Sequence, residues 1–385
     1  MFGLYIHIPY CLQRCSYCDF ATYVYDQILP PEDYVSYLKK EISIKTPLAG
    51  QQALTSIYFG GGTPSLLEPH LIVSILDHIA KCGFKTLPST EITLEINPAT
   101  LDTQKIMTLA AAGINRFSVG AQTFDETLLR AAGRKHSAQD TFDTLELLQK
   151  LGVNYSFDLL FALPNQSREM LSHDLKIISQ FKPPHLSAYC LTVPTGHPMS
   201  FDRAHDDDQA LMFSDIESSL ALINLHRYEI SNFSSPHKES QHNLLYWKQK
   251  PYLGFGLSAH SYLQHTSEWG DRFWNPSSVD NYVEYVRTLC DTPGPPMEKY
   301  RHQKLCESLS ITDSLFDICH TSLRLTEGLS LPYLHSLFPE HLCTQIQTRL
   351  EGLQKNTLVE LKNNHWTLTE TGRLLSNLVF ERLLL

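Results

Sequence analysis

The sequence lacks several features that mark common classes of protein. It has no uninterrupted run of eighteen apolar residues, so we expect no membrane-spanning helix. It has no basic excess, since 31 Lys and Arg stand against 41 Asp and Glu and the formal net charge is −10. A chain with this charge is not expected to bind nucleic acid in general. Its nine cysteines are an odd number without a disulfide-rich pattern, which favours a reducing compartment.

A cleavable leader is not expected either. An apolar, strand-like run begins at Leu4, almost at Met1, and removal of a leader would destroy it. Together with the cysteine usage, this predicts a cytoplasmic protein. The chain has 385 residues, 42% of them hydrophobic, which is enough for one large domain and a smaller one.

What the sequence does contain is a group of three cysteines directly after this first run. Cys11, Cys15 and Cys18 have the spacing C-x3-C-x2-C, whereas the other six cysteines are scattered singly. Zinc usually takes four ligands from two separated pairs, and no second pair follows. A [4Fe-4S] cluster held by three thiolates would keep one iron open to an outside ligand. The alternative is three incidental core cysteines, which the clustering disfavours.

Strands and helices are expected to alternate from the N-terminus to Leu191. The expected strands are 4–8, 55–59, 91–95, 114–119, 155–160 and 185–191, and the helices between them are 32–45, 70–81, 101–112, 137–151 and 171–180. Such alternation requires a parallel sheet with right-handed crossovers. Polar motifs after the strand ends favour an α/β fold with an incomplete (β/α)6 TIM-type barrel. Periodicity alone leaves an open doubly wound sheet as the alternative.

The pattern changes in the second half of the chain. We expect residues 1–195 to form the barrel, 196–290 an extension, and 299–385 a small, mostly helical, winged-helix-like domain. In the extension we expect a helix at 209–225, a strand at 228–233, a loop as far as Tyr262 and a helix at 280–289. The stretch Asp291-Thr-Pro-Gly-Pro-Pro296 is the clearest linker in the sequence.

A glycine-rich turn follows the second expected strand. In Gly60-Gly61-Gly62-Thr63-Pro64 the missing side chains allow close approach of a ligand, and backbone N–H groups could hold it. An ordinary tight turn is the alternative, because the spacing of a dinucleotide fingerprint is missing.

Four further polar residues lie within the expected strands or in the segments that follow them. Glu95 could bind ribose hydroxyls or could be a solvated loop acid. Gln122 follows a buried strand, and the Arg134 guanidinium could bind a carboxylate. Asp158 lies in a strongly apolar strand and therefore needs a partner.

Taken in order, these blocks resemble the oxygen-independent coproporphyrinogen III oxidase family of the radical S-adenosylmethionine (SAM) superfamily. The resemblance covers nearly the whole chain and includes the aromatic residue before the third cysteine. It implies that Cys11, Cys15 and Cys18 ligate a [4Fe-4S] cluster whose open iron binds SAM. It also implies contacts to SAM from Tyr5, Gly61, Gly62, Thr63, Glu95, Gln122, Arg134 and Asp158.

Two features of the sequence resemble the haem chaperone branch of that family. Phe20 stands where the true oxidases carry a fourth cysteine, and His242-Asn-Leu-Leu-Tyr-Trp247 is the mark of the chaperone branch. The resemblance implies binding of haem, delivery to haem-accepting proteins and a reductant for the cluster. The alternative is an oxygen-independent coproporphyrinogen III oxidase. His242 is a candidate axial haem ligand or a hydrogen-bonded structural histidine.

Overall fold

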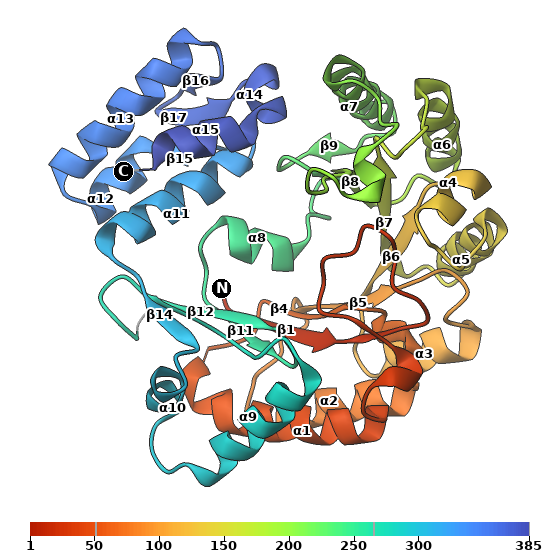
Figure 1. The fold of residues 1–385 in the computed structure, drawn as a ribbon, viewed down its shortest axis with the longest axis vertical. Coiled ribbons are helices and arrows are strands. Elements are labelled where there is room, and N and C mark those ends of the chain that lie inside the picture. The colour runs from red at the N-terminus through yellow and green to blue at the C-terminus, as the bar shows by residue number, and fades with distance from the viewer. Residues whose placement is uncertain (51, 265, 385) are drawn as a thin grey trace.

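The computed structural model describes residues 1–50, 52–264 and 266–384. The centre of the fold is a sheet of twelve strands (Figure 1). Six neighbouring strands are parallel and follow the order of the chain, and they are β1 (Gly3–Ile8), β4 (Ser56–Gly61), β5 (Glu91–Ile96), β6 (Arg116–Gln122), β7 (Asn154–Phe161) and β8 (His185–Cys190). Because the order never reverses, there is no topological switch point of the kind found in doubly wound sheets. The barrel prediction is confirmed, and the doubly wound alternative is excluded.

Helices connect these strands along the outside of the curved sheet, as Figure 1 shows. The connecting helices are α1 (Pro31–Lys45), α2 (Pro69–Lys81), α3 (Thr103–Ala111), α4 (Glu126–Ala131), α5 (Ala138–Lys150) and α6 (Arg168–Phe181). Local sequence sets their starts: Ser137 and Asp140 form a capping box at α5, and the Ser167 side chain caps α6. This arrangement places the carboxyl ends of the parallel strands at one mouth of the barrel.

The extension differs from its prediction in two places. The single strand expected at 228–233 is a pair of antiparallel strands, β9 (His226–Arg227) and β10 (Asn232–Ser234), and β10 pairs with β8. The loop expected up to Tyr262 contains a helix and a strand, α8 (Gln241–Trp247) and β11 (Tyr252–Phe255). Both expectations were wrong because these elements are too short to show a clear period in the sequence.

Strand β11 adds a seventh parallel strand beside β1. Leu4 lies opposite Leu253 in this pairing, and Ile6 lies opposite Phe255. Beyond β11 the sheet continues antiparallel, through β12 (His260–Leu263), β13 (Asp271–Trp274) and β14 (Cys306–Ser308). The extension therefore covers both edges of the six-stranded barrel instead of forming a unit of its own.

The C-terminal part of the chain has a separate hydrophobic core. Its elements are α11 (Ile311–Arg324), β15 (Leu329–Ser330), α12 (Leu331–Leu337), α13 (Glu340–Lys355), β16 (Val359–Lys362), β17 (His365–Leu368), α14 (Glu370–Leu374) and α15 (Ser376–Leu383). Met297 and Tyr300, on α10 (Pro296–His302), belong to the core of the barrel. The division of the chain at 1–195, 196–290 and 299–385 stays a prediction, and helix α10 packs into the core of the barrel.

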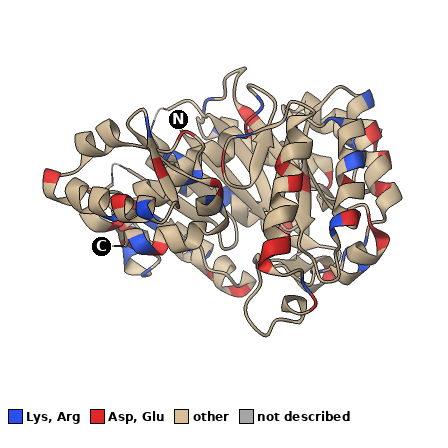
Figure 2. Ribbon diagram, turned by 90° about the horizontal axis from the view of Figure 1, so that it is seen from above, with Lys and Arg blue, Asp and Glu red and all other residues tan. Residues whose placement is uncertain are grey.

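The outer surface is mixed in charge. Figure 2 shows Lys and Arg interspersed with Asp and Glu over the elements of the chain. Within the described ranges, no helix is both long enough and apolar enough to cross a membrane.

One ion pair is fully buried where the extension packs on the barrel. Lys45 Nζ lies 2.5 Å from Glu41 Oε1 and donates to the Gly254 carbonyl oxygen and to Asn275 Oδ1. Glu41 also accepts from the Gly256 N–H, the Asn275 amide and the Tyr282 hydroxyl. A buried pair with so many partners fixes the position of the extension, because losing one charge leaves the other uncompensated.

We expect Lys45→Met to lower the thermal unfolding midpoint strongly, by a loss of about 3–5 kcal/mol, because it leaves Glu41 buried without its cation. The double variant Glu41→Gln, Lys45→Met should be more stable than Lys45→Met alone, since no charge is then left unpaired. Scanning calorimetry of the three proteins measures both effects. Equal midpoints for the two variants would contradict the role of the pair.

Candidate functional site

The three clustered cysteines lie on the loop that leaves β1 at the mouth of the barrel. Cys11 ends the short strand β2 (Tyr10–Cys11) and is buried, while Cys15 and Cys18 are partly exposed, and all three thiols are free. Burial raises the pKa of the Cys11 thiol, and the neighbouring Cys18 and Cys15 raise it further. Within the described residues, no three His, Cys, Asp or Glu side chains are placed to hold one metal ion. Three thiolates that each bind a different iron of one cluster do not need to meet at a single point.

A circuit of hydrogen bonds joins both ends of the cysteine loop to residues that follow the strands β4 and β5 and to the loop after α4. Arg134 Nη1 donates to Cys15 Sγ over 3.4 Å, and Arg134 Nη2 donates to Asn97 Oδ1 over 2.7 Å. The Asn97 amide donates to Thr63 Oγ1 over 2.9 Å, and the Thr63 hydroxyl donates to Cys11 Sγ over 3.9 Å. We call this set, Cys15–Arg134–Asn97–Thr63–Cys11, the sulfur circuit.

The direction of these hydrogen bonds fits the expected iron–sulfur cluster. At both ends of the sulfur circuit the cysteine sulfur is the acceptor. Donors of this kind stabilise thiolates, which are the form that binds iron, and hydrogen bonds to the sulfurs also tune a bound cluster. The Thr63 hydroxyl opposes the effect of burial and lowers the pKa of Cys11. The donor set therefore suits metal-bound thiolates better than neutral core thiols.

The N–H groups of the glycine-rich turn donate hydrogen bonds to other residues of the protein. The N–H of Gly61 donates to Glu95 Oε2, that of Gly62 to the Ile8 carbonyl, and that of Thr63 to the Tyr10 carbonyl. The expectation that these N–H groups face a ligand is therefore wrong. The carbonyl groups of a turn are acceptors and not donors, so they could bind only a ligand that donates hydrogen bonds.

Gly62 also allows close contact between the turn and the cysteine loop. A Cβ atom on Gly62 would lie 2.5 Å from the Tyr10 carbonyl oxygen and 3.0 Å from Cys11 Sγ. Neither contact is compatible with the observed backbone, so the absence of a side chain positions the first cysteine.

Two carboxyl groups lie inside the barrel mouth. Glu95 accepts from the Tyr58 hydroxyl over 2.7 Å and from the Gly61 N–H over 3.2 Å. Burial raises the pKa of Glu95 to about 7, and it raises that of Asp158 to about 6. Hydrogen bonds from Ser187 and Ser118 and the charges of Arg116 and Arg134 partly oppose the shift at Asp158. Both groups thus favour a ligand that brings positive charge or hydroxyl donors.

The remaining predicted contacts lie at the same mouth. Gln122 was expected to follow its strand, but it is the last residue of β6. Its φ is 70°, and the pairing of β6 with β7 shifts register just before it. A Cβ atom on Gly120 would lie 3.2 Å from the Gln122 amide and 3.3 Å from Arg134, so these two side chains converge. The Tyr5 hydroxyl is 3.1 Å from Nδ1 of His7, whose Nε2 is 2.9 Å from the Ala21 carbonyl oxygen.

His242 lies beside this group, since its ring stacks on that of Tyr5 with 6.3 Å between centroids, and both of its ring nitrogens have partners. Its Nδ1 is 2.8 Å from Ser56 Oγ, and its Nε2 is 2.8 Å from the Tyr246 hydroxyl. The ring is 1% exposed and stacks on Tyr58. Because both ring nitrogens have hydrogen-bond partners, this geometry favours the alternative that His242 is a structural histidine. Haem ligation by His242 stays an untested prediction.

Sequence reasoning missed two residues that organise the site. Asn97 occurs in the same block as Glu95 and forms the middle of the sulfur circuit, and its position next to Pro98 at a strand end was a usable signal. Tyr58 holds the Glu95 carboxyl group and stacks on His242. A tyrosine inside an apolar strand gives no comparable signal.

We expect Gly62→Ala to lower the iron and sulfide content after anaerobic reconstitution, because the new Cβ meets the Tyr10 carbonyl and Cys11 Sγ. Gly352→Ala is the matched control, since a Cβ there meets no heavy atom within 4 Å. Iron and sulfide assays on both proteins test the contact. Full iron content in Gly62→Ala would show that the turn does not position the cysteine loop.

The raised pKa of Glu95 predicts a pH dependence of stability. Between the ordinary value of 4.5 and about 7 the unfolded chain has lost the proton that the folded chain still holds. Folding stability should therefore fall as pH rises through this window, by up to about 1.4 kcal/mol per pH unit. The glutamine in Glu95→Gln cannot ionise. In the absence of SAM, the unfolding midpoint of this variant relative to that of the unsubstituted protein should therefore increase from pH 5 to pH 8. A constant difference would exclude the shift.

The comparisons with known proteins agree with this arrangement. Residues 5–178 match the family model of the Radical SAM superfamily. The protein named heme chaperone HemW from Bacillus subtilis is 31% identical, over 99% of this chain and 98% of the relative. The protein of the same name from Escherichia coli is 31% identical, over 98% of this chain and 97% of the relative.

A solved structure shows the same fold. Coproporphyrinogen III oxidase (HemN) from Escherichia coli, a radical SAM enzyme, aligns with a TM-score of 0.82 over 100% of this chain and 90% of that one, at 21% identity. The α/β radical SAM fold is thereby confirmed. Since relatives at 31% identity match almost from end to end, the chain belongs to the HemW family of radical SAM proteins.

Proposed function

We propose that this chain is a haem chaperone, which binds a [4Fe-4S] cluster, SAM and haem and passes haem to proteins that require it. The observation that carries the proposal is the match, over almost its whole length, to relatives named heme chaperone HemW. The three-cysteine loop at a barrel mouth is in keeping with it.

The radical SAM family implies the cluster and SAM. Cys11, Cys15 and Cys18 would hold the cluster through their thiolates and would leave one iron open to SAM, and the cluster would supply electron-transfer chemistry there. The carbonyls of the Gly61–Gly62 turn would accept from the amino group. The remaining N–H groups of Arg134 would donate to the SAM carboxylate.

The other side chains at the mouth would hold the nucleoside part of SAM. Glu95 would accept from the ribose hydroxyls, and Asp158 would add negative charge opposite the sulfonium. Tyr5, Thr63 and Gln122 would complete the pocket. Gln122 ends β6 and Thr63 follows β4, whereas Tyr5 and Asp158 lie within β1 and β7.

The second candidate is oxygen-independent coproporphyrinogen III oxidase, the oxidative decarboxylation of two propionates to vinyl groups. The similarity in fold to the Escherichia coli oxidase favours it. Phe20, in the place of the oxidases' fourth cysteine, counts against it; the side chain is 65% exposed beside the cysteine loop.

The partners follow from the chaperone proposal. Haem is the cargo, haem-requiring proteins receive it, and a reductant supplies electrons to the cluster. We place this activity in the cytoplasm, in keeping with nine free cysteines.

The two candidates are separated by one anaerobic experiment on the reconstituted protein. We expect stoichiometric haem binding in an absorbance titration and no conversion of coproporphyrinogen III to protoporphyrinogen IX in the presence of SAM and a reductant. Turnover at enzyme-like rates without stable haem binding would overturn the proposal.

The same preparation tests the cluster ligands. Cys15→Ala should lose most of its iron and sulfide and its cluster absorbance, since each thiolate binds its own iron. Cys290→Ala, which changes a single exposed cysteine outside the loop, is the matched control. Full cluster content in Cys15→Ala would exclude the assignment.

A further inference from the structure

A cavity with an aromatic lining lies next to the cysteine loop. Its volume is about 360 Å³, and its lining includes Tyr5, Phe20, Tyr246, Tyr252, Ser258 and His260. Tyr5 also belongs to the predicted SAM contacts. The cavity therefore adjoins the barrel mouth on the side where the extension covers β1.

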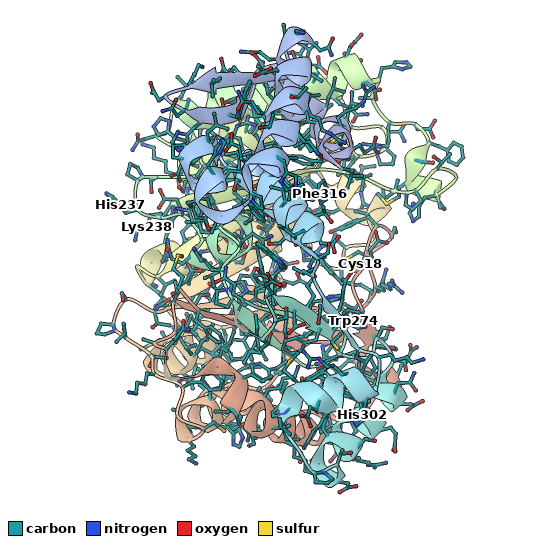
Figure 3. The ribbon with its side chains drawn as sticks, turned by 90° about the vertical axis from the view of Figure 1, so that its left-hand side faces the viewer. Cys18, His237, Lys238, Trp274, His302 and Phe316 are labelled. Atoms are coloured by element: carbon teal, nitrogen blue, oxygen red, sulfur yellow. The ribbon has the colours of Figure 1, made fainter. Side chains whose placement is uncertain are left out.

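A second cavity, of about 650 Å³, meets the first at Ser258 and His260 and is lined on its far side by Trp274 and Tyr285. Both volumes fall within the roughly 300–1,000 Å³ of ordinary small-molecule sites. Figure 3 shows Trp274 in the same region of the molecule as Cys18 of the cysteine loop. Together the cavities offer space for a ligand that is wide and flat.

The wall of the first cavity is set by His242. Its Nε2 is 2.8 Å from the Tyr246 hydroxyl, and the Tyr246 ring meets Tyr252 edge-on, with 4.7 Å between ring centroids. Aromatic side chains in such a wall suit an extended π-system. The hydrogen bond with His242 therefore fixes the orientation of the Tyr246 ring, which lines the cavity.

His260 stands where the two cavities meet. Within the described residues, its ring makes no hydrogen bond, and it stacks on Trp274 with 6.1 Å between centroids. Desolvation and the charge of Arg272 lower the pKa of the imidazole, so its nitrogen lone pair is free at neutral pH. In contrast to His242, this histidine combines access to a cavity with an uncommitted ring.

We propose that haem binds across these two cavities with His260 as an axial ligand of its iron, and that His242 acts only by positioning Tyr246. The inference rests on the proposed function, because it assumes that haem is the cargo. Neutral imidazole is a common axial ligand of haem iron. Tyr246, Tyr252 and Phe20 would pack against the macrocycle, and Tyr5 would place this haem beside the SAM site.

Titration of the cluster-loaded protein with ferric haem, followed as difference spectra in the Soret region, tests the assignment. We expect His260→Ala to weaken binding by about tenfold or more. His260→Cys should restore tight binding with the spectrum of a thiolate-ligated haem, which a structural role of His260 would not produce. His341→Ala, at an exposed position of α13, is the matched control and should bind like the unsubstituted protein.

Pulsed electron paramagnetic resonance on protein carrying isotopically labelled histidine nitrogen identifies the ligand directly. The hyperfine coupling to the label should be present in the unsubstituted protein and in His242→Gln, and absent in His260→Ala. Haem binding with the coupling lost in His242→Gln and kept in His260→Ala would overturn the inference while the chaperone function stands. If the unsubstituted protein binds no haem, the proposed function fails as well.

Discussion

The sulfur circuit is the interaction on which the site depends. It connects Cys15 to Cys11 through Arg134, Asn97 and Thr63, and the hydrogen at each end of it is donated to a cysteine sulfur. The cysteine loop has little regular structure of its own, since β2 pairs only with the two-residue strand β3 (Tyr23–Val24). The N–H of Ser16 adds one backbone bond to the Ala132 carbonyl oxygen. A loop held in this way keeps its shape only when the barrel behind it is formed.

Much of the barrel could be predicted from the sequence because its signals are local. Most of the parallel strands are buried apolar runs. The helices α3 to α6 have side-chain caps, as Ser137 and Ser167 show, and α1 and α2 begin with a proline. The family's motifs lie at strand ends, which parallel topology brings to one mouth. That is why Glu95 and Arg134 could be placed near a common ligand without coordinates.

The predictions failed where contacts between residues far apart in the sequence determine the structure. The N–H groups of the glycine-rich turn are taken by Ile8, Tyr10 and Glu95, and nothing in the turn itself indicates this. His242 is bonded to Ser56, 186 residues away in the sequence, so its local block could not show that both nitrogens are engaged. His260 follows the same block of the sequence, but its sequence gives no sign of a role, because the two cavities that it lines exist only in the folded chain.

The pairing of β1 with β11 also has a consequence for the order of folding. Gly3 to Ile6 lie opposite Tyr252 to Phe255, so one edge of β1 waits for a partner that is synthesised about 250 residues later. Until then, that edge is an open template for incorrect strand pairing. During this interval the cysteine loop is already synthesised, whereas the wall that the extension contributes beside it is not. The nascent chain thus contains the three free cysteines of this loop for some time before the strand that closes the edge beside them is made.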